Sequence, residues 1–158
     1  MSIAPKLCHY LDEIKAEYDL VEHQPTKSSL ETATASSIPP EQVVKAVLLD
    51  TADDRLLAVL PSDSRIDLSE LGSELGRKPR LADEAELRGV FDDCDVGAVP
   101  PGLGYDVVTI VDDALERQPD VYFEAGDHVS LVHMDKFEFA RVMKGARHGS
   151  FSEPWVPD

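Results

Sequence analysis

Three short segments of the chain carry residue types that could do chemistry. The first is the apolar run Val43–Leu49, in which Lys45 is the only charged residue. Side chains alternate between the two faces of a strand, so Lys45 shares a face with Val43, Val47 and Leu49. Both faces are apolar, which is typical of a central strand, where an unpaired ammonium group is costly. The lysine is therefore paired or functional, unless it extends its head group to water along its aliphatic stem.

The second segment is rich in glycine and proline. Glycine lets a backbone approach a ligand closely, and proline lowers the entropy cost of holding a loop in one shape. The backbone N–H groups of such a loop could face a ligand carbonyl, although an ordinary structural turn is the alternative. The segment lacks the residues of a phosphate-binding loop. It consists of Gly97, Ala98, Val99, Pro100, Pro101, Gly102, Leu103 and Gly104.

The third segment is Glu124–His128, which lies between two apolar runs. The Gly126-Asp127 pair is typical of a tight turn, so His128 could simply begin the next strand. Histidine is also the usual general acid or base near neutral pH. A second histidine, His23, would come near Lys45 if strand pairing brought the two together.

Signatures of a nucleophile or a metal centre are absent from the sequence. Cys94 lies among aspartates, which raise the pKa of a thiol and make it a poor thiolate. Ser62 and Ser64 lack the Gly-x-Ser-x-Gly elbow. There is no Cys-x-x-Cys, no His-Glu-x-x-His and no acid cluster with metal-ligand spacing. An enzyme of this sequence would therefore use water, positioning and backbone dipoles rather than a covalent intermediate, a metal or another cofactor.

Short helices and strands in mixed order must position these segments. Hydrophobic periodicity predicts strands over residues 19–23, 43–50, 56–60, 107–111, 121–124 and 129–134, and helices over residues 5–18 and 137–143. Capping-box signals at Ser28, Asp67 and Asp83 predict three further helices. Several strands follow one another without a crossover helix. We therefore expect an α/β (α+β) fold with a mixed sheet and packed helices.

The length of 158 residues is that of one domain. We assign residues 1–145 to a single compact domain and residues 146–158 to a loosely ordered C-terminal tail. No apolar run approaches the roughly 20 residues that a membrane span needs, and no secretory signal is apparent. Only two cysteines are present, Cys8 and Cys94. A reducing, cytoplasmic location is therefore expected.

The charge balance is strongly acidic. Thirty-one acidic residues against 15 basic ones give a formal net charge of −16. Broad binding to a phosphate backbone needs clustered Lys and Arg, so this balance argues against DNA binding. Solvated acidic surface or adaptation to a salty cytoplasm would explain the surplus equally well.

The order and spacing of these motifs resemble the YbaK/ProX family of aminoacyl-tRNA deacylases, relatives of the editing domain inserted in bacterial prolyl-tRNA synthetases. Each motif alone is weak, but together they make a fairly specific likeness over roughly residues 20 to 145. The matching segments are Pro40–Lys45, Leu57–Pro61, Ile66–Leu68, Gly97–Gly102 and Glu124–His128.

The resemblance implies a function as well as a fold. Family members hydrolyse the ester between a wrongly attached amino acid and its tRNA, without a metal or a covalent nucleophile, on a mixed, barrel-like sheet wrapped by helices. Lys45 occupies the position of the essential lysine, and the loop that begins with Gly97 and Ala98 faces the aminoacyl carbonyl. The implied partner is a mischarged tRNA. Given the acid surplus, either the protein touches only the acceptor end of this tRNA, or a synthetase partner holds the tRNA. Implied substrate-binding residues are His23, Val99, Pro100, Pro101, Gly102, Gly126 and His128.

The chain departs from the family pattern at two positions. Ala46 stands where relatives specific for alanyl-tRNA(Pro) carry asparagine, and Pro101 stands where many members have phenylalanine. The sequence therefore leaves the edited amino acid open. Two other functions also stay open: a non-catalytic module that binds an aminoacyl or nucleotide-like group or docks to a synthetase, and a structural domain in which Lys45 is exposed or ion-paired.

Overall fold

The computed structural model describes residues 3–26, 28–52, 54–95 and 98–154. The described strands form a five-stranded sheet in the order β5-β2-β3-β6-β9, a three-stranded sheet in the order β1-β8-β7 and the pair β10-β4. This arrangement confirms the mixed α/β single domain, but the ladders give separate sheets rather than one closed barrel. The strands are β1 (Asp19–Glu22), β2 (Val44–Asp50), β3 (Arg55–Pro61), β4 (Ser64–Ile66), β5 (Arg80–Leu81), β6 (Val108–Asp112), β7 (Asp120–Glu124), β8 (Ser130–Asp135), β9 (Arg147–Gly149) and β10 (Ser152–Pro154).

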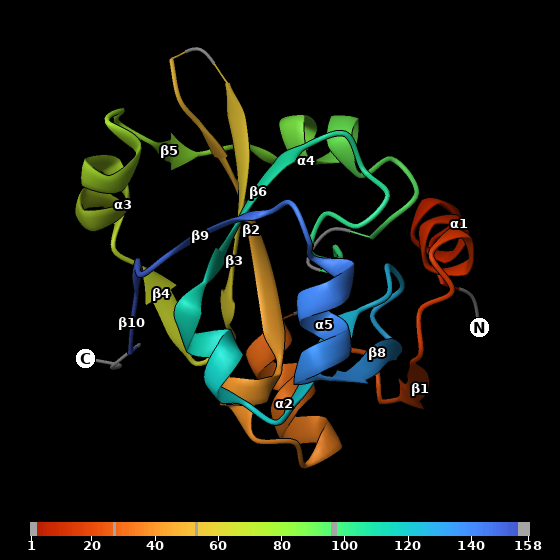
Figure 1. Ribbon diagram of the computed structural model, residues 1–158. Coiled ribbons are helices and arrows are strands. Elements are labelled where there is room, and N and C mark those ends of the chain that lie inside the picture. The colour runs from red at the N-terminus through yellow and green to blue at the C-terminus, as the bar shows by residue number, and fades with distance from the viewer. Residues whose placement is uncertain (1–2, 27, 53, 96–97, 155–158) are drawn as a thin grey trace.

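Helices surround the sheets (Figure 1). Helix α3 lies beside β4 and β5 at one flank, while α1 lies at the opposite flank, near β1. None of the helices among the described residues has the length and apolar content that a membrane span requires. The helices are α1 (Pro5–Glu13), α2 (Ser29–Ser36), α3 (Leu68–Leu75), α4 (Glu84–Val90) and α5 (Lys136–Val142), with 3-10 helices η1 (Pro40–Gln42) and η2 (Asp113–Arg117).

Three helices begin at the capping residues that the sequence predicts. At each start the cap side chain accepts a hydrogen bond from the backbone N–H three residues later: Ser28 from Glu31, Asp67 from Glu70 and Asp83 from Glu86. These bonds satisfy N–H groups that have no partner within the helix.

Helix α1 is shorter than the predicted 5–18, because a Schellman motif ends it. The Ala16 N–H donates to the Leu11 carbonyl, and Lys15 takes a left-handed φ of 54°.

The strand that carries Lys45 is central, as its two apolar faces predict. It pairs antiparallel with β3 over its whole length and with β5 at its C-terminal end, and β3 pairs parallel with β6. Alternate residues of β3 face two different hydrophobic cores: Leu57 and Val59 face a larger one, and Leu56 and Ala58 face a smaller one. Helices α1 and α5 and the three-stranded sheet close the larger core, and α3 covers the smaller one.

A single parallel bridge between Val43 and Tyr122 joins the two larger sheets. It brings the start of β2, just before Lys45, beside β7, two residues before Glu124. Both side chains point away from the larger core, since their sequence neighbours on β2 and β7 face it.

The C-terminal segment is ordered further than its sequence predicts. We expected a loosely ordered tail from residue 146, but β9 adds to the five-stranded sheet next to β6, and β10 pairs with β4. Between them, Phe151 is only 1% exposed and fills the smaller core. Residues 155–158 of the predicted tail lie outside the described residues.

One buried carboxylate fastens this segment, and its removal gives a test of the fold. Asp112 accepts hydrogen bonds from the backbone N–H groups of Ala114, Phe151 and Ser152, at 2.8, 3.0 and 2.7 Å. We expect Asp112→Ala to lower the free energy of unfolding by about 3 kcal/mol or more, because buried N–H groups lose a charged acceptor. Urea unfolding measures the loss, and the exposed Asp106→Ala is the matched control, with an expected change within about 0.5 kcal/mol. Equal stabilities of the two variants would contradict this account.

Candidate functional site

Lys45 is half-buried on β2, on the face that also carries Val47 and Leu49. Burial lowers the pKa of its ammonium group below the ordinary value, and the negative charge of Asp63 opposes that shift. Asp63 lies in the turn between β3 and β4. No ion pair within the described part of the chain includes Lys45. The purely structural interpretation expects Lys45 to be either exposed or ion-paired, and among the described residues it is neither.

The turn after β7 has a fixed shape. The Asp127 carboxylate accepts hydrogen bonds from the backbone N–H groups of Val129 and Ser130, at 3.1 and 2.9 Å. Gly126 has a φ of 107°, and a Cβ added there would lie 2.8 Å from the Ala4 Cβ, so the position requires glycine. His128 has a left-handed φ of 63° and precedes β8. It therefore belongs to the turn and does not begin the next strand.

A buried polar cluster lies beside this turn. The side chains of His23 and Glu124 are 0% and 2% exposed, and His23 Nε2 lies 3.6 Å from Glu124 Oε2. The other oxygen, Glu124 Oε1, accepts a hydrogen bond from the Thr32 hydroxyl of α2 at 2.8 Å. The cluster thus joins the end of β1, helix α2 and the end of β7. The ring of His23, a predicted substrate-binding residue, is buried within this cluster.

Burial raises the pKa of Glu124 above its ordinary value. The Thr32 hydrogen bond and the nearby His23 and His128 oppose this shift. The carboxyl group is therefore held closer to its neutral form than an exposed glutamate.

The glycine/proline loop is anchored to the same turn. The Asp95 N–H donates to the Gly126 carbonyl at 2.8 Å, and the Ala98 N–H donates to the Asp95 carbonyl at 3.1 Å. The Ala98 N–H, expected to face a substrate, is thus already occupied. Gly97 lies outside the described residues. Within those residues, no hydrogen bond uses the N–H of Val99, which is half-buried.

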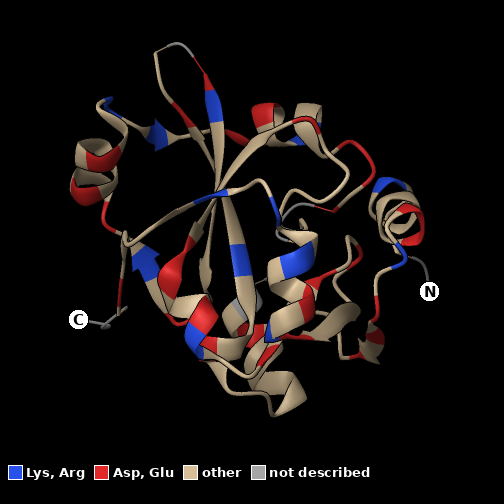
Figure 2. Cartoon of the chain, viewed as in Figure 1, with Lys and Arg blue, Asp and Glu red and all other residues tan. Residues whose placement is uncertain are grey.

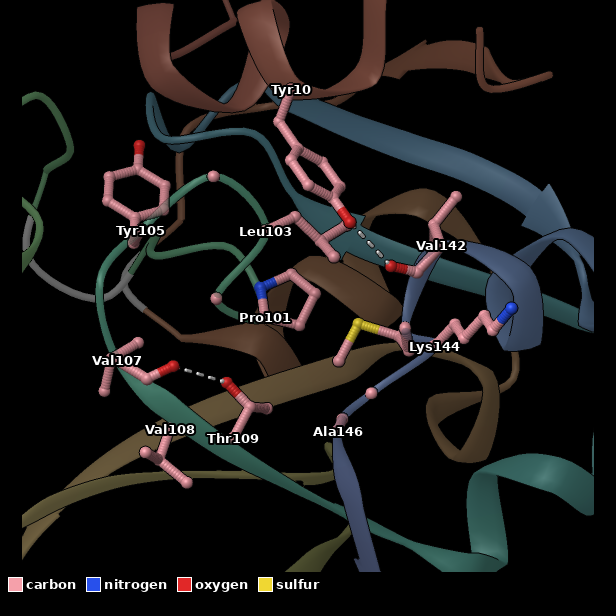
Figure 3. Close-up of a pocket in the computed structure, with 14 residues that line it drawn as sticks. Tyr10, Pro101, Leu103, Tyr105, Val107, Val108, Thr109, Val142, Lys144 and Ala146 are labelled. Atoms are coloured by element: carbon pink, nitrogen blue, oxygen red, sulfur yellow. Dashed lines mark hydrogen bonds between the residues drawn. The ribbon is translucent and has the colours of Figure 1, made fainter. Parts of the chain in front are cut away.

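The second half of the loop lines a surface cavity of about 380 Å³ (Figure 3). Pro101 and Gly102 contribute to one wall, while Tyr10 of α1 and the end of α5 form others. Gly102 has a φ of 87°, and a Cβ there would lie 2.5 Å from the Thr109 hydroxyl oxygen, which excludes other residues. Lys45 is not among the residues that line this cavity.

The thiol beside the loop is unreactive, as its sequence predicts. Burial, together with the negative charges nearby, raises the pKa of Cys94 to about 12. A hydrogen bond between its sulfur and the Tyr105 hydroxyl opposes that shift. Such a thiol carries almost no thiolate near neutral pH.

One group among the described residues has ligand atoms close enough for a metal ion. Asp113, Glu116 and His148 place one ligand atom each within 4.8 Å of one another. They come from η2 and β9, two separate segments, so their sequence spacing did not indicate the group. All three side chains are substantially exposed, and none belongs to the cluster around Glu124.

The structure thus gathers part of the predicted site and separates the rest. His23, Gly126 and His128 lie around the turn after β7, and the Val43–Tyr122 bridge brings the strand of Lys45 beside β7. Pro101 lines the cavity, and Pro100 is buried before it. The sequence analysis missed Glu124 and Thr32 as partners of His23. The acid at the end of the apolar run 121–124 was a usable signal, because, like Lys45, it is a charged residue in a segment that is expected to be buried.

Known proteins share this architecture. The structure of the hypothetical protein APE2540 matches with a TM-score of 0.84 and 23% identity, over 94% of this chain and 99% of that one. A candidate trans-editing enzyme for prolyl-tRNA synthetase matches with a TM-score of 0.80 and 22% identity, over 96% and 99%. A candidate signal transduction protein from Marinobacter aquaeolei has a TM-score of 0.71 and 19% identity, with 96% of this chain matching 31% of that protein. At these identities the likeness shows the fold alone. No curated protein matches the chain.

The family comparison goes further than the fold. The model of the aminoacyl-tRNA editing domain matches residues 23–142, about three quarters of the chain. The matched span includes Lys45, the glycine/proline loop and the Glu124–His128 turn, and it begins at His23. The chain therefore belongs to the aminoacyl-tRNA editing domain family, also known as the YbaK family.

Proposed function

We propose that the protein is a trans-editing deacylase, which hydrolyses the ester of a mischarged tRNA with Lys45 at its active site. Membership of the editing family supports an editing role. The observation that carries the specific proposal is the desolvated ammonium group of Lys45, which has no ion pair among the described residues. Its strand is bridged to β7, just before the turn that anchors the loop. A charge kept in this costly place is available to bind the anionic or polar part of a substrate.

The proposed reaction needs neither a covalent intermediate nor a metal. Water attacks the ester carbonyl with help from a substrate hydroxyl, and the carbonyl oxygen takes up negative charge in the tetrahedral intermediate. Its collapse breaks the bond to the ribose oxygen and releases the amino acid and the tRNA. Lys45 orients the substrate electrostatically, while loop N–H groups stabilise the oxyanion.

The contacts of the loop narrow the choice of oxyanion donor. The N–H groups of Ala98 and Gly102 donate to the carbonyls of Asp95 and Pro100, and proline has no N–H. Among the described residues from Ala98 to Gly102, the Val99 N–H is the one left for the substrate.

The charge distribution favours a limited contact with tRNA. Figure 2 shows acidic residues on α3 and α4, whereas basic residues are spread over β4, β5, β9 and α5 without forming a band. Extended binding along a phosphate backbone needs such a band. We therefore propose that the protein contacts the acceptor end, with a synthetase partner as the holder of the tRNA.

The acid surplus also favours the second candidate, a module that binds an aminoacyl group or docks to a synthetase without catalysis. A panel of mischarged tRNAs, with a pull-down of synthetases in parallel, separates the two. Hydrolysis of any member supports the deacylase, and synthetase capture with a negative panel supports the module.

Loss of the Lys45 charge should abolish editing. We expect Lys45→Ala to lower kcat/KM for deacylation of the hydrolysed tRNA at least about 100-fold, because a desolvated charge is a strong electrostatic contact. Lys45→Arg, which keeps the charge, should retain more activity than Lys45→Ala. Undiminished hydrolysis by Lys45→Ala would refute the proposed role.

Removal of a single loop N–H tests the oxyanion donor. Val99→Pro deletes the N–H at a position whose backbone is already restricted by the proline that follows, so little change of shape is expected. We expect kcat to fall about 100- to 1,000-fold. Val99→Ala keeps the N–H and is the control, with near-normal kcat. Equal rates for both variants, at matched thermal stability, would exclude Val99 as the donor.

The pKa of Lys45 gives a test that does not need a substrate. Since burial lowers the pKa of Lys45 and Asp63 partly restores it, Asp63→Asn should lower the pKa of Lys45 further. The exposed Lys6 is an internal reference, because its hydrogen bond to Asp92 raises the pKa of Lys6. NMR titration of labelled lysines should place the pKa of Lys45 below that of Lys6. A protonated Lys45 is the active form, so its contribution to deacylation is lost as the pH rises through this lowered pKa.

A further inference from the structure

Two buried polar atoms face each other in the cluster beside the turn, and neither has a hydrogen-bond partner. They are His23 Nε2 and Glu124 Oε2, at 3.6 Å, each fully enclosed. This separation is about 0.7 Å longer than an ordinary hydrogen bond. Unpaired buried polar atoms are rare in folded proteins and call for a physical explanation.

The other contacts of the two side chains fix where a proton can lie. His23 Nδ1 is 2.7 Å from the Gln24 carbonyl, which can only accept, so Nδ1 carries a hydrogen. Glu124 Oε1 accepts from Thr32. If the ring is neutral and the carboxyl ionised, Nε2 and Oε2 are two acceptors with no hydrogen between them. One added proton, on either atom, turns them into a donor and an acceptor.

The pair lies where the site is held together. Glu124 is the last residue of β7, and the turn that follows it accepts the Asp95 N–H that anchors the loop. The backbone N–H of His23 donates to the Val129 carbonyl at the other end of the turn. Repulsion within the pair therefore acts on both ends of the turn that holds the loop.

Few other charges face the pair. His128 and Asp127 belong to the turn itself, and the Asp127 carboxylate is occupied by backbone N–H groups. Lys45 lies on β2, whose start is bridged to β7, with Asp63 as its nearby acid. From α2 the cluster receives the neutral Thr32 hydroxyl. Among these groups, His23 and Glu124 place two buried polar atoms against each other, so one proton gained or lost there changes their contact directly.

We propose that His23 and Glu124 form a positioning pair for the editing reaction, which holds the glycine/proline loop in place only while the pair carries one shared proton. The proposal rests on the proposed deacylase function. It assigns neither residue a contact with the substrate. It predicts a fall in rate, as the pH rises and the pair loses its proton, that is separate from the fall caused by loss of the Lys45 charge and that depends on Glu124.

Glu124→Gln tests the pair, because an amide supplies the missing hydrogen permanently. The Gln carbonyl can accept from Thr32, and its NH₂ can donate to the lone pair on His23 Nε2. After correction for uncatalysed hydrolysis, we expect the wild-type kcat to fall about three- to tenfold in one step as the pH rises from 6 to 9. This factor corresponds to the net free energy of one hydrogen bond. In Glu124→Gln the step should be absent. A variant that keeps the step, or that is inactive at every pH, overturns the proposal.

A second variant tests the direction in which the step in kcat moves along the pH axis. The Thr32 hydroxyl opposes the rise in the pKa of Glu124, so Thr32→Val should move the step to higher pH with little change of shape. A step that stays in place or moves to lower pH contradicts the shared proton.

NMR of the His23 ring separates this proposal from the proposed function. The Nε2 signal of His23 in the wild-type protein should change at the pH of the rate step, because the contact with Glu124 changes there, whereas in Glu124→Gln this signal should stay constant. A ring that titrates alike in both proteins overturns the pair. If the ring responds as expected while every tRNA in the panel stays intact, the deacylase function fails and the shared proton stands.

Discussion

The parallel bridge between Val43 and Tyr122 is the constraint on which the candidate site depends. It is the point where the five-stranded sheet, which carries Lys45, meets the three-stranded sheet, which carries Glu124. The bridge places the start of the lysine's strand beside β7, just before the turn that follows β7. That turn anchors the loop through the Asp95 N–H. The side of the sheet on which Lys45 lies is set separately, by the register of β2 against β3.

Features that depend on nearby residues could be predicted from the sequence, and those that depend on distant residues could not. The caps at Ser28, Asp67 and Asp83 are local hydrogen bonds across three residues, so their sequence pattern is sufficient. The two-residue β5 and the three-residue β9 and β10 are too short to show a hydrophobic periodicity. They form strands because other strands pair with them. The same reason hid the partner of His23, which follows from the register of β1 against β8 and of β8 against β7.

Part of the acid surplus has a structural use. Aspartate side chains cap the starts of α3, α4, η2 and α5, where the backbone N–H groups of a helix lack partners. Others bind arginines, as when Asp50 accepts from Arg80 at 2.8 Å. These acids are accounted for by local contacts and do not mark an acidic active centre. The surplus therefore bears on which partners can approach, rather than on the chemistry of the site.

Buried polar groups in this protein fall into two classes, and the difference separates structure from candidate function. Asp112 is 2% exposed, yet its carboxylate accepts three backbone N–H groups, so burial leaves nothing unsatisfied. Lys45 lacks an ion pair among the described residues, and the facing atoms of His23 and Glu124 lack hydrogen bonds. Folding alone would favour apolar residues at such positions, because an unpaired buried polar group costs about 1–3 kcal/mol. Their location around one turn and one loop is most simply explained by a ligand and a proton, which supply the missing partners when the site is in use.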